Sequence, residues 1–166
     1  MSVYKHFYIQ QQRLVGSAYE NIGPVVDSYE TFHIACQETE YKYLPEIKEL
    51  PVTNWHDEDG DDVYIPTDGT KIEAYDYSVD FLYVGSEATM NADIKGFINF
   101  LFGRNDGGSS LFCFYDEYTM IGRRCCYVKN IDNDLFIYNN SDDEVHAKFK
   151  LTIRVTDPTT DWEVGE

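Results

Sequence analysis

The stretch Tyr75-Asp76-Tyr77-Ser78-Val79-Asp80-Phe81-Leu82-Tyr83 decides the fold class, because its side chains alternate between apolar and polar. Successive side chains of a β-strand point to opposite faces of the sheet. The alternation therefore predicts a strand with one buried and one solvated face. The tyrosines of this stretch could alternatively form a sugar-binding surface, but packing in a hydrophobic core is the interpretation we favour.

A second alternating run, Val145 to Val155, lies near the end of the chain and stops at Pro158. Three shorter runs are also predicted to be strands: Leu111 to Tyr115, Arg123 to Ile131 and Leu135 to Tyr138. The polar stretches Asn133-Asp134 and Asn139 to Asp143 supply the turns between them. Strands that follow one another through short turns favour antiparallel pairing.

The region between these strands contains one helix signal. Ile94, Phe97, Ile98, Leu101 and Phe102 recur at the spacing of one helical face. Asn91 is suited to cap a helix that begins near Ala92, and Gly103 stands where helices commonly end. The pattern predicts an amphipathic helix at about residues 92–102.

These elements predict a mainly β, α+β fold, namely an antiparallel β-sandwich with one flanking amphipathic helix. We expect one domain over residues 1–166, with its core at 51–158 and a loose tail at 159–166. Residues 1–50 are expected to form an N-terminal arm or edge strands, with short strands at Tyr4 to Gln10 and near Ile34. Pro45 and Pro51 favour an extended connection or an edge strand between Glu38 and Pro51.

The acidic stretch Asp57-Glu58-Asp59-Gly60-Asp61-Asp62 is typical of a tight turn. Asp57, Asp59 and Asp61 also have the first three spacings of a calcium-binding loop. The sixth and twelfth positions of that motif require Gly and Glu, but the chain has Asp62 and Asp68 there. We therefore predict a structural turn and no metal site.

Charge excludes one class of partner. The formal net charge is −17, and Met1 to Tyr118 carries 21 acidic and 7 basic residues. Affinity for nucleic acid comes from Lys and Arg that neutralise phosphates, so we expect no specific nucleic-acid binding. No apolar run is long enough to cross a membrane and no signal peptide begins the chain, which predicts a soluble protein made in the cytoplasm. The four cysteines lack the spacing of a metal site and are predicted to be reduced structural thiols.

No catalytic motif is present. The four histidines are far apart in sequence, no G-x-S-x-G elbow occurs, and the glycines at 107 and 108 lack the lysine of a phosphate-binding loop. Arg123 and Arg124 form the densest basic spot, which could contact an acidic patch on a neighbouring copy or pair within the chain. The sequence therefore predicts neither an enzyme nor a cofactor.

The order of these features resembles the N-terminal domain of siphophage distal tail proteins and the wider phage tail-tube-like family. The resemblance covers Trp55 to Ile65, Tyr75 to Tyr83, Ala92 to Phe102, Leu111 to Tyr118 and the final strand ending at Pro158, about two thirds of the chain. It implies a β-sandwich with a flanking helix that assembles, typically as a hexamer, into a ring continuing the tail tube. It brings no catalytic residues.

The expected function is that of a non-enzymatic structural subunit of a phage or prophage tail, located in the virion and acting by homo-oligomerisation. Other tail or baseplate proteins are the expected further partners. Asp59, Asp61, Arg123 and Arg124 are the candidate interface or lumen contacts, since an acidic lumen would not retain DNA phosphates. The alternative is a non-catalytic β-sandwich that binds a carbohydrate or lipid, and a hydrolase with two unidentified carboxylates ranks last.

Overall fold

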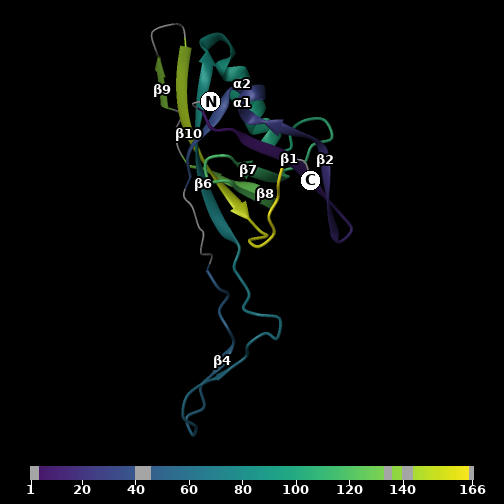
Figure 1. Ribbon diagram of the computed structural model, residues 1–166, viewed down its shortest axis with the longest axis vertical. Helices are drawn as coiled ribbons and strands as arrows, with labels where there is room; N and C mark the ends of the chain where they lie inside the picture. The colour runs from purple at the N-terminus through teal and green to yellow at the C-terminus, as the bar shows by residue number, and fades with distance from the viewer. Residues whose placement is uncertain (1–3, 40–45, 133–135, 140–143, 165–166) are drawn as a thin grey trace.

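The computed structural model describes residues 4–39, 46–132, 136–139 and 144–164. The fold class prediction is confirmed: the chain is mainly β, with an antiparallel sheet and a flanking helix (Figure 1). The elements are β1 (Phe7–Val15), β2 (Ala18–Asp27), α1 (Ser28–Phe32), β3 (Ile34–Thr39), β4 (Val52–Thr53), β5 (Asp62–Val63), β6 (Tyr75–Ser86), α2 (Glu87–Leu101), β7 (Leu111–Asp116), β8 (Ile121–Ile131), β9 (Phe136–Asn139) and β10 (Glu144–Val155).

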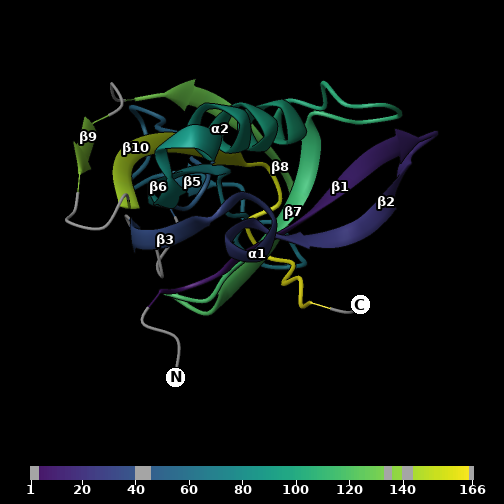
Figure 2. The same ribbon diagram turned by 90° about the horizontal axis from the view of Figure 1, so that it is seen from above.

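The main sheet has the order β2-β1-β7-β8-β10-β6-β3, and β9 pairs with the first part of β10. The sheet curls so that β3 meets the segment before β1, where the backbone N–H of Cys36 donates to the carbonyl of Lys5 at 2.9 Å. Figure 2 shows this curl from above, with α2 across the top and the β1–β2 hairpin extending to the right. The two facing layers enclose the core of the sandwich.

The two alternating sequence runs form the longest pair of strands. β6 and β10 are antiparallel along their whole length, from Tyr75 opposite Val155 to Ser86 opposite Glu144. Tyr75, Tyr77 and Tyr83 are buried, as core packing requires. The rings that might have formed a sugar-binding surface therefore face the interior.

Aromatic side chains from both layers meet at Phe81. Its ring lies 5.1 Å from that of Phe7, 5.2 Å from that of Phe97 and 5.5 Å from that of Phe149, measured between centroids. Edge-to-face and offset contacts of this kind add to the free energy gained by burying the rings. They join β1, β6, β10 and α2 in one core.

Helix α2 begins five residues earlier than predicted. Ser86, not Asn91, stands at its N-cap in extended conformation, and Asn91 lies inside the helix. The reason is that β6 continues to Ser86 and passes directly into the helix, where the Ser86 and Thr89 hydroxyls lie 2.9 Å apart. The predicted end is confirmed, because Gly103 follows with a φ of +68°.

Of the two expectations for residues 1–50, the structure shows edge strands, because β2 and β3 stand at the two ends of the sheet order. The described residues of this part do not form an appended arm, because β1 lies inside the sheet and Phe7, Ile9 and Ile34 are fully buried. The end of the chain is not a loose tail, because Trp162 is 4% exposed and its backbone N–H donates to the carbonyl of Gly122 at 3.3 Å. The turn predicted at 133–134, and the middle of the predicted 38–51 connection, lie outside the described residues. Of the turn predicted at Asn139 to Asp143, Asn139 ends β9 and residues 140–143 lie outside the described residues.

Candidate interaction surfaces

A projecting arm, residues 46–74, leaves the body between β3 and β6 (Figure 1). It is a two-limbed ladder with few backbone bonds: Lys48 N–H donates to the Lys71 carbonyl at 2.8 Å, and Tyr64 N–H to the Pro51 carbonyl at 3.0 Å. Between these bonds and the tip, β4 pairs with β5. A turn at Pro66 to Gly69 lies within it, with Gly69 N–H donating to the Pro66 carbonyl at 3.2 Å.

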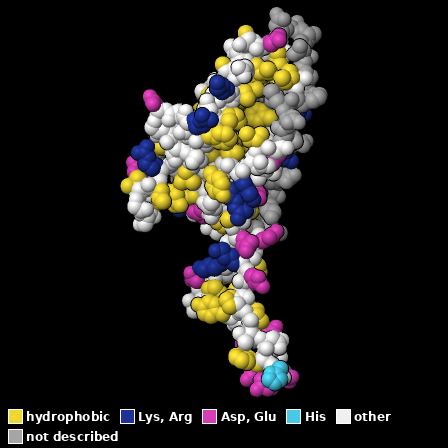
Figure 3. Space-filling model, turned by 180° about the vertical axis from the view of Figure 1, so that it is seen from behind, with side chains coloured by type: hydrophobic (Ala, Val, Ile, Leu, Met, Phe, Trp, Pro, Cys, Tyr) yellow, Lys and Arg dark blue, Asp and Glu magenta, His cyan; other side chains and the backbone are white. Residues whose placement is uncertain are grey.

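No residue of the projecting arm is buried. It nevertheless carries six of the large hydrophobic side chains that the structure leaves exposed, and Figure 3 shows apolar side chains along its length. These are Ile47, Val52, Trp55, Val63, Tyr64 and Ile65, with exposed fractions from 42% to 65%. A large exposed apolar surface on a segment without a core of its own is typical of a contact site for another molecule.

The tip of the projecting arm is the acidic turn, and it contains the candidate contacts Asp59 and Asp61. Both are exposed, and the side-chain amide of Asn54 donates to the Asp61 carboxylate at 2.7 Å. The indole N–H of Trp55 donates to Asp62 at 3.0 Å, so two side chains of one limb hold the other. Among the described residues, no group of three or more His, Cys, Asp or Glu side chains is arranged to hold a metal ion.

The other two candidates, Arg123 and Arg124, lie in β8 and form ion pairs within the chain. The Arg123 guanidinium binds the carboxylate of Asp161, and Arg124 Nε lies 3.1 Å from an oxygen of Asp157. Asp59 and Asp61 therefore lie together at the tip, and Arg123 and Arg124 lie on the body. Of the two expectations for the arginines, the structure therefore shows pairing within the chain.

Sequence reasoning missed a larger basic region. Six of the 13 Lys and Arg residues lie on the neighbouring strands β8 and β10, which together contain a single acidic residue, Glu144. We call β8 and β10 the basic strand pair. Its cations are Arg123, Arg124, Lys129, Lys148, Lys150 and Arg154. The alternation of Lys148, Lys150 and Arg154 with apolar residues was visible in the sequence, but the adjacency of β8 and β10 was not.

Part of the basic strand pair is bound to Asp76 of β6. Lys129 Nζ and Arg154 Nη1 lie 2.9 Å and 3.0 Å from the two oxygens of this carboxylate. Hydrogen bonding from Lys129, and then from Arg154, lowers the pKa of Asp76 below its ordinary value although partial burial opposes this. One carboxylate therefore serves two cations, one from each strand of the pair.

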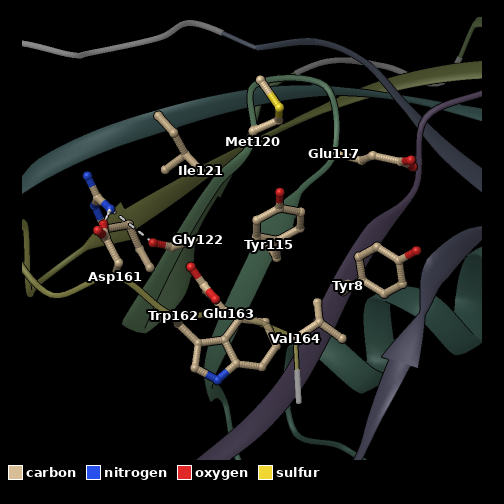
Figure 4. A pocket seen from close by; sticks show the side chains of 11 residues that line it. Tyr8, Tyr115, Glu117, Met120, Ile121, Gly122, Asp161, Trp162, Glu163 and Val164 are labelled. Atoms are coloured by element: carbon tan, nitrogen blue, oxygen red, sulfur yellow. Dashed lines mark hydrogen bonds and ion pairs between the residues drawn. The ribbon is translucent and has the colours of Figure 1, made fainter. Parts of the chain in front are cut away.

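A groove of about 820 Å³ lies between β1, β7, β8 and the end of the chain (Figure 4). The rings of Tyr8 and Tyr115 form part of its wall, with centroids 6.3 Å apart. Glu117, Glu163 and the Arg123–Asp161 pair add polar groups, and Trp162 closes one side. Burial, then the carboxylates of Asp27 and Glu117, raises the pKa of Tyr8. The groove combines aromatic surface with hydrogen-bond donors and acceptors, as small-ligand sites do.

The residues most often used in catalysis are dispersed. His6, His33 and His146 each lie beside a different carboxylate, those of Asp27, Asp93 and Glu144. All four cysteines are free and buried, and burial raises the pKa of Cys113 to about 12. A thiol with a raised pKa is a poor nucleophile at neutral pH.

Comparison of the chain with protein-family models, curated proteins and solved structures found no match. Among the described residues, no helix is both long and apolar enough to span a membrane. The interpretation of function therefore depends on the surfaces described above.

Proposed function

We propose that this protein is a non-enzymatic structural subunit of a phage or prophage tail that assembles with copies of itself. A distal tail or tail-tube-like ring, in the virion and in contact with other tail or baseplate proteins, is the assembly proposed. The fold that the resemblance implied, an antiparallel sandwich with a flanking helix, is the fold observed. That agreement supports the proposal at the level of fold.

The observation that carries the proposal is the projecting arm. Six large apolar side chains are exposed on its 29 residues, and none of these residues is buried. Exposing apolar surface to water costs roughly 25 cal/mol per Å², so covering these side chains in an assembly is favourable. A segment of this kind stabilises a complex, and it contributes little to the stability of a monomer.

Free strand edges supply a second means of association. β2 lies at one end of the sheet order, and its hairpin with β1 carries exposed Leu14, Val15 and Tyr19 at the tip. An edge strand presents unpaired backbone groups to which another chain can add. Pro24 lies within β2 and limits such pairing, because proline has no N–H to donate.

Light scattering after size-exclusion chromatography tests the proposal. The full chain should show multiples of 19.3 kDa that increase with concentration, and rings should appear in negative-stain micrographs. A variant of the projecting arm with Val52→Thr, Trp55→Ser, Tyr64→Ser and Ile65→Thr should elute as a monomer. Its matched control, Tyr118→Ser with Ile137→Thr, removes exposed apolar side chains from the body and should still assemble. A strict monomer at all concentrations contradicts the proposal.

The groove favours a second candidate, a non-catalytic ligand-binding sandwich. Its aromatic wall and mixed polar groups suit a carbohydrate better than a lipid, because Glu117, Glu163 and Arg123 can bond to hydroxyls. The chain has two tryptophans, so Trp55→Phe leaves Trp162 of the groove as the sole indole. A monomeric protein whose Trp162 emission changes on titration with oligosaccharides identified on a glycan array would favour this function.

A further inference from the structure

We propose that the groove between β1, β7, β8 and the end of the chain binds an amino sugar, with the Glu163 carboxylate against the ammonium group of the sugar. This inference rests on the carbohydrate-binding candidate above and names the class of sugar. The groove lies on the body, and none of the described residues that line it belongs to the projecting arm.

The walls of the groove are held in place by bonds within the chain. On one side, the backbone N–H of Trp162 donates to the carbonyl of Gly122, which attaches the end of the chain to β8. On the other side, the backbone N–H of Glu117 donates to the carbonyl of His6 at 3.1 Å, and the Glu117 carboxylate accepts from the His6 N–H at 2.8 Å. Because the walls are preformed, little ordering is required when a ligand binds.

Two tyrosine rings give the groove its aromatic surface. Tyr8 of β1 and Tyr115 of β7 are directly opposite each other in the sheet, and their ring centroids are 6.3 Å apart. Neither hydroxyl forms a hydrogen bond with a described residue. The rings can therefore pack against the apolar face of a sugar while their hydroxyls bond to its polar groups.

The indole of Trp162 is a donor that the chain itself leaves unused. The side chain lines the groove and is 4% exposed, yet its Nε1 has no hydrogen-bond partner among the described residues. An unpaired buried donor costs free energy, and a ligand oxygen that accepts from it removes that cost. A lysine side chain has no acceptor to offer, whereas sugar hydroxyls both donate and accept.

The charges of the groove select the class of sugar. Arg123 is the one cation among the described lining residues, and it already binds the carboxylate of Asp161. Glu163 forms no hydrogen bond or ion pair with a described residue, and Figure 4 shows its carboxylate between Asp161 and Tyr115. The free charge of the groove is therefore negative, which repels acidic sugars and attracts an ammonium group.

A neutral sugar fits this arrangement less well than an amino sugar. It would cover the Glu163 carboxylate without neutralising it, and a carboxylate removed from water without a counter-charge is unfavourable. An ammonium group supplies that charge together with hydrogen-bond donors, and the face of a tyrosine ring attracts it further. Amino sugars combine this cation with the hydroxyl acceptors that the Trp162 N–H lacks within the chain.

Titration with glucosamine tetramers tests the site. The probe is the β-linked tetramer with free amino groups, and its matched ligand is the fully N-acetylated tetramer, which has the same rings without the charge. Calorimetry on the full chain in mildly acidic buffer, where the sugar amines are protonated, should show at least about tenfold tighter binding of the free-amine tetramer. In a Trp55→Phe background, the emission of Trp162 should change during the same titration.

Matched variants locate the effect in the groove. Glu163→Gln keeps the size of the side chain and should abolish most of the preference for the free-amine tetramer. Glu20→Gln removes the same charge from an exposed position of the body outside the groove and should keep that preference. Tyr115→Leu should weaken the binding of both tetramers, whereas Tyr127→Leu, which removes a partly exposed ring of β8 outside the groove, should not. Thermal melts confirm that each variant is folded.

The outcomes separate this inference from the function on which it rests. Equal binding of the two tetramers, or a preference that survives Glu163→Gln, would overturn the amino-sugar assignment and leave carbohydrate binding intact. A trilysine peptide that bound as tightly as the free-amine tetramer would overturn the sugar assignment, because the groove would then be a general cation site. Failure of both tetramers to bind would overturn the inference, and the second candidate function would fail with it if the glycan array also gave no ligand.

Discussion

Large apolar side chains are mostly buried in the body but exposed in the projecting arm. In the body, Phe7, Tyr77, Phe81 and Phe114 have no exposed surface, whereas in the arm Tyr64 is 65% exposed. The body buries its apolar groups by folding, and the arm leaves them exposed. The comparison teaches that stability and proposed function lie in different parts of this molecule.

The largest expected effect is in the body. Phe81→Ala should lower the free energy of unfolding by about 3–5 kcal/mol, because it removes a fully buried ring that touches three others. Urea titration at low protein concentration measures it. Tyr64→Ala, in the projecting arm, should cost less than about 0.5 kcal/mol under the same conditions. Equal losses for the two variants would mean that the arm packs in the monomer and would break the comparison.

The division between body and arm was predictable only in part. Period-two alternation identified β6 and β10, since each buries one face, and Gly103 marked the end of α2. The start of α2 was wrong because β6 leads into the helix without a turn, so that its N-cap, Ser86, is also the last residue of the strand. The place of β1 in the sheet depends on its pairing with β7, about 100 residues later. A local sequence pattern does not reveal such a long-range pairing.

The interaction surfaces were predicted less completely. The acidic turn was visible in the sequence, but its place at the end of a long exposed ladder was not. The local sequence does not show whether other parts of the chain pack against residues 46–74. The four candidate contacts were divided between the tip and the body. The basic strand pair was missed because β8 and β10 are separated in sequence by residues 132–143, and their charges become one surface through sheet pairing.

The end of the chain offers a case between the two regions, since it is irregular like the arm but anchored like the body. A methyl group at Gly122 would lie 1.8 Å from the carbonyl oxygen of Trp162, so Gly122→Ala should displace residues 161–164. We expect a loss of up to about 3 kcal/mol, as for an overpacked site. In a Trp55→Phe background, the emission of Trp162 should shift to longer wavelength.

Gly96→Ala is the matched control for this change. Its methyl group would meet only the edge of the Phe32 ring, at 3.2 Å, and alanine is the better helix former by about 1 kcal/mol. Stability should therefore be kept or raised. An unchanged Trp162 spectrum in Gly122→Ala would show that residues 161–164 are not anchored at Gly122. The end of the chain would then resemble the projecting arm, which has no buried residue.

A smaller effect is expected at the buried carboxylate of Asp116. It accepts hydrogen bonds from the Tyr77 hydroxyl at 2.8 Å, the Thr119 hydroxyl at 3.1 Å and the Tyr118 backbone N–H at 2.8 Å. An asparagine amide can accept on one side only, so Asp116→Asn should cost about 2 kcal/mol by leaving a buried donor unpaired. Thermal melts measure this loss, and Tyr77→Phe, which removes one donor, should cost less. If Asp116→Asn were neutral, the polar groups of the body would be as dispensable as those of the arm.

The smallest effect is expected at Asp76, where the projecting arm has just rejoined the body and one carboxylate holds Lys129 and Arg154. Asp76→Asn should lower stability by about 0.5–1 kcal/mol, the range of partly exposed ion pairs. Because the pKa of Asp76 in the folded protein lies below its ordinary 3.8, its contribution is present above pH 3.8 and is lost as the pH falls through the lower folded value. Urea titrations at pH 7 and at pH 3 should therefore give a difference between variant and unmodified chain that shrinks in acid. If the stability difference between Asp76→Asn and the unmodified chain stayed constant with pH, the effect would come from packing. The ion pairs of Asp76 would then contribute nothing to the stability of this part of β6.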